Sequence, residues 1–154
     1  LFETGIYVSS SSTNPTGQLY QISIGSLFML ELSRQGDKII IEVDQDPFSA
    51  SGEEYIGSFS LDTWTTLRIE CYTMAEENGI EVPHLKLWID NIISGDSTNY
   101  TGYGKSAPND AGFTNVQIYT LVSASAECYF DNVYVRKLTK TYDAYDDSVW
   151  DDRN

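Results

Sequence analysis

Apolar and polar residues alternate along most of this chain with a period of two. The clearest case is the segment 66–72, which places three apolar residues on one face and three polar or aromatic residues on the other: Leu67, Ile69 and Cys71 against Arg68, Glu70 and Tyr72. Successive side chains of a β-strand point to opposite faces, so this period is typical of a half-buried strand. The pattern predicts a sheet protein whose strands each give one face to a core.

The segment 85–90 repeats the alternation, and short strands are also expected over 5–8, 19–24, 28–32, 39–43, 55–59, 116–121 and 129–136. Turn residues separate them: Gly36-Asp37, Asn78-Gly79 and Asp90-Asn91, the last read as a hairpin tip. No stretch of ten or more residues keeps a 3.6-residue period, so no long helix is expected. Many short strands between turns predict an all-β fold, a two-sheet antiparallel β-sandwich.

The length of 154 residues suits one domain. We assign residues 1–139 to the sandwich and residues 140–154 to a C-terminal tail that mixes aromatics with carboxylates. Composition leaves two alternatives for this tail, a mobile segment or one that docks on the domain or on a neighbour.

The net charge of −14, from 23 acidic and 9 basic residues, argues against nucleic-acid binding because such a field repels phosphate. The same charge suits a solvated acidic surface and attracts cations such as calcium. No run approaches the roughly 18 apolar residues of a membrane span, so no membrane insertion is expected. The chain begins with Leu1 rather than Met, which we interpret as a processed product or a part of a longer protein.

Three motifs, residues 64–70, 85–91 and 129–133, together resemble the laminin-G-like, concanavalin A-like family of jelly-roll domains. Residues 64–70 are similar to the family's tryptophan-led central strand, and residues 85–91 to its apolar hairpin ending in Asp-Gly, with Asn91 in place of Gly. Residues 129–133 are similar to its closing strand. The resemblance implies two antiparallel sheets packed face to face, and it implies no particular ligand.

Laminarinase-type glycoside hydrolases share this fold and carry Glu-x-Asp-x-x-Glu on one strand. Glu42 and Asp44 match the first two acidic positions, but Pro47 stands where the family has its acid/base glutamate. Retaining hydrolysis needs two carboxyl groups, and proline supplies none. The single histidine, His84, has no nucleophile partner. We therefore expect no enzyme and interpret residues 42–46 as an acidic strand end, with cation binding as the alternative.

Trp88 is the predicted ligand contact. A sugar ring stacks on an indole through its C–H face, and flanking polar groups hold its hydroxyls. The predicted ligand-binding residues share one sheet face if their two strands are neighbours: Trp88, Lys86, Asp90, Arg68, Glu70 and Tyr72. The alternative is that Trp88 packs under a loop or against another subunit.

Asp131 interrupts the apolar alternation of the closing strand. In related carbohydrate-binding sandwiches an Asp in this strand helps to hold a structural calcium ion. The resemblance therefore makes Asp131 a candidate metal ligand, with Glu3 as a second, since terminal strands often pair in these folds. The alternative is a buried Asp131 that accepts backbone N–H groups. A structural calcium ion is the one candidate cofactor.

Two cysteines, Cys71 and Cys128, either form a disulfide or remain buried thiols. For the whole chain we expect a non-catalytic binding or adhesion module that recognises glycans or cell-surface polysaccharide. It would belong to a larger extracellular, cell-surface or virion protein. The alternative is a structural or decoration domain of a virion, fibre or surface assembly, held by contacts with other subunits.

Overall fold

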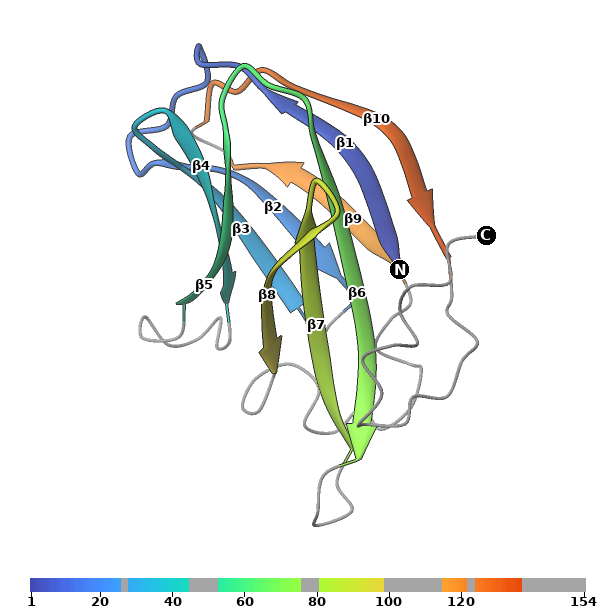
Figure 1. The fold of residues 1–154 in the computed structure, drawn as a ribbon. Coiled ribbons are helices and arrows are strands. Elements are labelled where there is room, and N and C mark those ends of the chain that lie inside the picture. The colour runs from blue at the N-terminus through green and yellow to red at the C-terminus, as the bar shows by residue number, and fades with distance from the viewer. Residues whose placement is uncertain (26–27, 45–52, 76–80, 99–114, 122–123, 137–154) are drawn as a thin grey trace.

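A computed structural model of the protein describes residues 1–25, 28–44, 53–75, 81–98, 115–121 and 124–136. These residues form strands and turns, with no helix among them (Figure 1). The strands are β1 (Phe2–Val8), β2 (Gln18–Ile24), β3 (Phe28–Gln35), β4 (Lys38–Asp44), β5 (Glu53–Ser60), β6 (Thr65–Ala75), β7 (Glu81–Ile89), β8 (Ile92–Thr98), β9 (Val116–Thr120) and β10 (Cys128–Val135).

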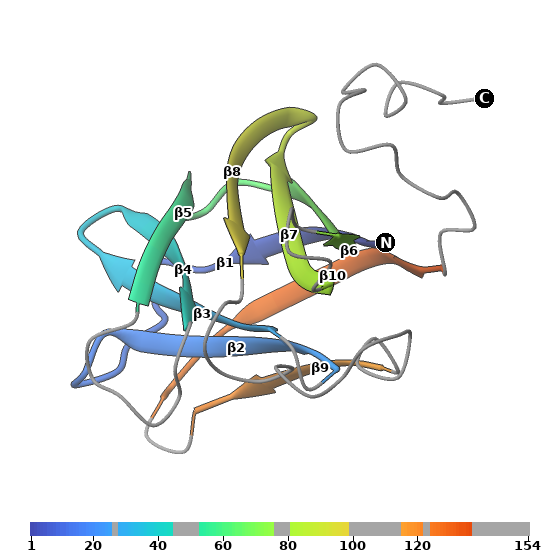
Figure 2. The ribbon, with the colours of Figure 1, turned by 90° about the horizontal axis from the view of Figure 1, so that it is seen from below.

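The strands make two five-stranded antiparallel sheets. The first sheet has the order β10-β1-β6-β7-β8 and the second has the order β5-β4-β3-β2-β9. Figure 2 shows the two sheets stacked as layers, with β2 and β9 in one and β1, β6 and β10 in the other. The predicted two-sheet antiparallel β-sandwich is confirmed.

The core lies between the sheets and takes its buried side chains from β1 to β7, while Val116 and Ile118 of β9 and Phe130 of β10 pack against it partly buried. Leu67 and Ile69 of β6 and Leu85 and Leu87 of β7 are buried, as the alternation predicts. The second sheet contributes a matching set of buried apolar side chains: Ile22, Leu30, Leu32, Ile39 and Ile41. Because the core takes the apolar side chains that point inward, the outer face of each sheet is left for polar and aromatic residues.

Both tight hairpins named from the sequence are present. Gly36 has φ 64° at the first position of the two-residue loop between β3 and β4, as a type II′ turn requires. Asp90 and Asn91 have φ 51° and 67° between β7 and β8, the signature of a type I′ turn. Asn78-Gly79 and the tail 140–154 lie outside the described residues.

The two sheets come together at one side through glycines. A Cβ atom at Gly57 of β5 would lie 2.4 Å from the Ser94 hydroxyl oxygen, and one at Gly95 of β8 would lie 2.5 Å from the Ile56 carbonyl oxygen. The Ser94 hydroxyl donates a hydrogen bond to that carbonyl at 3.0 Å. A side chain at either glycine would push β5 and β8 apart.

The cysteines are free thiols, which excludes the disulfide alternative. Cys128 pairs with Val8 at one end of β1, whereas Cys71 lies two residues beyond Ile69, which pairs with Phe2 at the other end. Seven strand residues span roughly 20 Å, well beyond disulfide reach. Burial is the main cause that raises the pKa of each thiol to about 12. In the described segments, no helix has the length and apolar character to cross a membrane.

We predict that Ile69→Ala lowers the free energy of unfolding by about 2–5 kcal/mol, because it leaves a cavity at a core position that is 1% exposed. The matched control is Ile92→Ala, where the same group is removed from a side chain that is 72% exposed, with an expected cost below about 0.5 kcal/mol. Urea denaturation of both variants measures the two values. Equal losses would contradict the assignment of these faces.

Candidate functional site

The outer face of the first sheet gathers most of the residues predicted to bind a ligand. Strands β6 and β7 are neighbours, so Arg68 lies opposite Trp88, Glu70 opposite Lys86 and Tyr72 opposite His84. Tyr72 and His84 are stacked with ring centroids 5.5 Å apart. The condition stated for these residues, that the two strands adjoin, is therefore met.

Asp90 has a different position from the rest of this set. It lies in the turn where the alternation of β7 ends, and its carboxylate accepts the backbone N–H of Thr66 at 2.8 Å. The Asp90 N–H in turn donates to the Thr66 carbonyl at 2.9 Å. This reciprocal pair holds the hairpin tip against β6.

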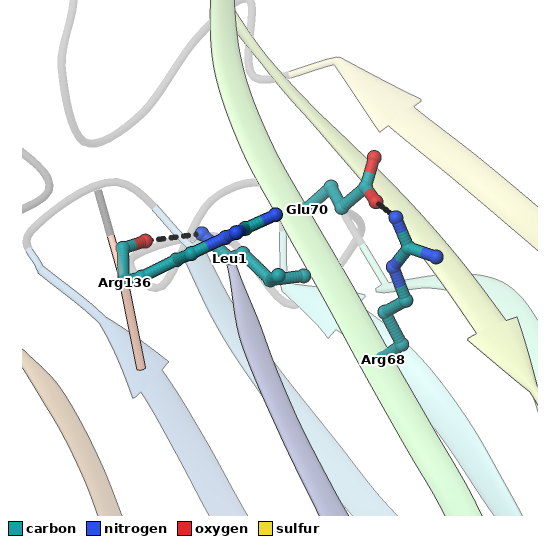
Figure 3. A network of polar contacts seen from close by, with 4 residues as sticks. All are labelled: Leu1, Arg68, Glu70 and Arg136. Carbon is teal, nitrogen blue, oxygen red and sulfur yellow. Dashed lines mark hydrogen bonds and ion pairs between the residues drawn. The ribbon is translucent and has the colours of Figure 1, made fainter. Parts of the chain in front are cut away.

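Trp88 is covered on one side by its neighbour. The Arg68 guanidinium carbon lies 5.1 Å from the centroid of the Trp88 ring, within the range of a cation–π contact. Arg68 also forms an ion pair with Glu70, as Figure 3 shows along β6. A sugar ring that stacked on this indole would have to use the other face or displace the guanidinium. The contact packs Trp88 against a side chain of its own sheet, and sugar binding at Trp88 stays a prediction.

Glu70 is fully buried although it lies on the outer face of the sheet. Burial raises the pKa of its carboxyl group, and the charge of Arg68 opposes this shift without cancelling it. The Glu70 Oε2 and Arg68 Nε atoms are both buried without a hydrogen-bond partner. Figure 3 also shows Leu1, which directly precedes β1, and Arg136, which directly follows β10; the Leu1 nitrogen donates to the Arg136 carbonyl at 2.9 Å. This cluster has the features of a packed ionic contact.

The two predicted metal ligands lie close in register on neighbouring strands. Glu3 of β1 pairs with Tyr134 of β10, and Gly5 pairs with Asp131. A bulge at Asn132, where φ is 52°, separates the two pairs. Asp131 is exposed rather than buried, and its carboxylate accepts the N–H of Asn132 at 2.8 Å. Across the described ranges, no three His, Cys, Asp or Glu side chains come together as a metal site would need. Calcium at Asp131 and Glu3 stays a prediction.

A second arrangement, on the outer face of the second sheet, was not predicted. One residue from each of its five strands forms a transverse row: Tyr55, Glu42, Glu31, Gln21 and Tyr119. We call this the tyrosine–glutamate row. With strands about 4.8 Å apart, the row measures about 19 Å from tyrosine to tyrosine.

The middle of the row is a carboxylate held in place by amides. Glu31 is only 7% exposed, and its two oxygens accept hydrogen bonds from the side-chain amides of Gln18 and Gln21, the latter at 2.9 Å. A buried carboxylate needs such donors to offset its lost hydration. Glu31 is thereby a fixed acceptor directly beside Glu42 of the next strand.

The two ends of the row are exposed aromatic rings with anchored hydroxyls. Tyr55 is 60% exposed and its hydroxyl donates to Ser58 Oγ at 3.3 Å. Tyr119 is 39% exposed and its hydroxyl shares a 2.6 Å hydrogen bond with Ser23 Oγ. Anchored rings lose little conformational freedom when a ligand stacks on them.

Within this row, the pairing of Glu31 with Glu42 could have been predicted from the sequence. The two-residue turn Gly36-Asp37 pairs Gln35 with Lys38, and counting outward from that pair brings Glu31 opposite Glu42. Tyr119 has no such signal, because β9 joins β2 across most of the chain.

The chain matches no protein-family model, no curated protein and no solved structure. A β-sandwich is not specific to the concanavalin A-like and laminin-G-like family, so that resemblance stays a prediction.

We predict that Glu70 makes the protein less stable as the pH rises. Its pKa is raised in the folded state, so the fold is disfavoured as pH rises from the unfolded value, about 4.3, to the folded one. The variant Glu70→Gln removes this contribution to the pH dependence of stability. Its stability relative to the native protein should therefore improve through that window and then level off, as measured by urea denaturation at a series of pH values.

Glu127→Gln serves as a control of opposite sign. Hydrogen bonds from Tyr129 and Ser11 lower the pKa of Glu127, so its contribution is present above the unfolded value and is lost as the pH falls. This variant should lose stability relative to the native protein as the pH rises. The same trend in both variants would mean that the burial of Glu70 has been misassigned.

Proposed function

We propose that this domain is a non-catalytic module that binds glycans through the outer face of its second sheet. The observation that carries the proposal is the tyrosine–glutamate row. It places an exposed ring at each end of a tract of hydrogen-bonding groups, the pairing of apolar and polar contacts that sugar recognition uses. Its length suits a linear oligosaccharide lying across the strands.

The charge of the tract narrows the class of glycan. Glu31 and Glu42 are adjacent carboxylates on a chain whose net charge is −14. Sulfated sugars and uronic acids would be repelled by this field. Neutral sugars would donate their hydroxyls to the carboxylates, and amino sugars would add an attraction between opposite charges. We therefore propose neutral or amino-sugar chains.

The proposed role is binding rather than hydrolysis. Both oxygens of Glu31 are engaged by Gln18 and Gln21, which suits an acceptor held in one position. Pro47 in place of the family's acid/base glutamate supports the same conclusion. An extracellular, cell-surface or virion setting goes with this role as part of the proposal.

The proposal predicts that native protein on an array of neutral, amino and acidic glycans binds the first two classes. Tyr119→Ala and Tyr55→Ala should each weaken that binding about five- to thirtyfold, since a stacked ring contributes on the order of 1–2 kcal/mol. Two further variants give the comparison. Trp88→Ala tests the site predicted from the sequence, and Tyr134→Ala removes an exposed tyrosine of the first sheet.

Each result of the array has a separate meaning. Loss of binding in Trp88→Ala alone would move the site to the first sheet. Equal loss in Tyr134→Ala would show a general effect of exposed aromatics. Cleavage of a bound oligosaccharide that stops in Glu42→Gln would contradict the non-catalytic role, and an array without any binding would remove the glycan proposal.

A second candidate function, a structural domain of a larger assembly, has one observation in its favour. Strand β10 is an edge of the first sheet, and three consecutive large residues at its end are exposed: Val133, Tyr134 and Val135. Exposed apolar side chains on a sheet edge favour pairing with another chain.

If β10 mediates assembly, the native protein should form dimers or larger species that depend on concentration in size-exclusion chromatography with light scattering. Val133→Lys should return it to a monomer, because a lysine on an edge strand blocks strand addition. Ile92→Lys makes the same change on the opposite edge, β8, and should leave the assembly intact. A native protein that stays monomeric at its highest soluble concentration would contradict the idea.

A further inference from the structure

Three aromatic rings meet on the outer face of the first sheet and share no residue with either site described above. Tyr7 of β1 lies between Tyr129, its partner on β10, and Trp64, which directly precedes β6. The ring centroid of Tyr7 lies 5.8 Å from that of Trp64 and 6.0 Å from that of Tyr129. The interplanar angles are 49° and 57°, so the rings do not form one flat surface. We call these residues the aromatic cluster.

The indole of Trp64 rests on the backbone of β1. A Cβ atom at Gly5 would lie 3.6 Å from two atoms of its six-membered ring, so the ring occupies the space above a residue without a side chain. Trp64 is nevertheless 52% exposed, and Tyr129 is exposed to a similar degree. One side of the indole is supported by the sheet while much of the ring remains open to a ligand.

Two carboxylates hold the tyrosines of the cluster. Tyr7 donates its hydroxyl hydrogen bond to Asp62 Oδ1 at 3.3 Å, and Tyr129 donates to Glu127 Oε1 at 2.6 Å. Asp62 also accepts the N–H of Ser10 at 2.8 Å, and Glu127 accepts from the Ser11 hydroxyl at 2.9 Å. These hydrogen bonds lower the pKa of both carboxyl groups, so both are ionised at neutral pH.

One basic side chain acts on this region. The charge of Arg34 helps to lower the pKa of Asp62, but its guanidinium donates to the carbonyls of Ser10 and Ser12 at 2.6 and 2.8 Å. Arg34 thus braces the loop that positions Ser10 rather than stacking on a ring of the cluster. The rings combine with two negative charges and with the negative field of the whole chain.

We propose that the aromatic cluster binds a cationic quaternary ammonium group of the choline type. Aromatic faces attract organic cations through the ring quadrupole, and adjacent carboxylates strengthen that attraction. Three rings at different angles suit a round trimethylammonium head better than the flat face of a pyranose. This inference is independent of the proposed glycan site, because the two sites share no residue and lie on opposite sheets.

The probe is choline chloride, added to the whole protein and followed by NMR shifts of the Trp64 indole N–H. Its neutral isostere, 3,3-dimethyl-1-butanol, has the same shape without the charge. Choline should bind with an affinity about tenfold or more above that of the alcohol, since the cation–π attraction is electrostatic. Phosphocholine should bind more weakly than choline, because the carboxylates of Asp62 and Glu127 repel its negatively charged phosphate.

Variants of the protein distinguish the contribution of the two carboxylate charges to choline affinity from the contribution of the aromatic rings. The double variant Asp62→Asn, Glu127→Gln keeps hydrogen-bond acceptors beside both tyrosines and removes both charges, so choline affinity should fall while the unfolding curve at neutral pH shows an intact fold. Tyr129→Ala should also weaken choline binding. Trp88→Ala is the matched aromatic control and should leave it unchanged, as should Tyr119→Ala, which tests the glycan proposal separately.

Equal binding of choline and the neutral alcohol would overturn the inference and show a merely apolar surface. Unchanged choline affinity in the double charge variant would also overturn it. If the indole N–H of Trp64 responds to neutral sugars and not to choline, the cluster is a sugar platform and the ammonium inference is wrong.

Discussion

The division of the strands into a face toward the core and an outer face is the constraint on which the rest of this structure depends. Leu67, Ile69, Leu85 and Leu87 must face the second sheet, because together with its apolar residues they form the core. Their neighbours in sequence are thereby forced outward, and the pairing register brings them into rows across the sheet. The glutamates and tyrosines of the strands discussed above, together with Trp88, lie on the outer faces of the sheets for this reason, because moving one of them inward would turn a whole strand.

Two buried glutamates on the outer faces show how differently a sheet surface can stabilise a charge. Glu70 is paired along its own strand with Arg68, which also stacks on Trp88, so the charge is neutralised within a packed patch. Glu31 is held by two amides of the neighbouring strand, which satisfy its oxygens and leave its charge uncompensated by them. A patch that is internally neutral offers little to a polar ligand. An acceptor that is held in one position between exposed rings offers far more.

The faces of the strands and the local turns could be predicted from the sequence, whereas the long-range pairing of the strands could not. Alternation at Leu67 and Ile69 was enough to predict what is buried, and Asp90-Asn91 was enough to predict a hairpin. The contact of Arg68 with Trp88 needed the β6–β7 register, which depends on a connection through residues 76–80. The meeting of Tyr7 with Trp64 and Tyr129 needed the order β10-β1-β6, which no local signal specifies.

The position of β1 has a consequence for how the chain acquires its structure. Phe2 pairs on one side with Ile69 and on the other with Val135, so the first strand has no neighbour that is close to it in sequence. The hairpins β3–β4 and β7–β8 can close as soon as they are made, but β1 has to wait for both of its partners. Closing such distant pairs makes folding slow, and during synthesis the edge of β1 that pairs with β10 stays unpaired until residues 128–135 have emerged.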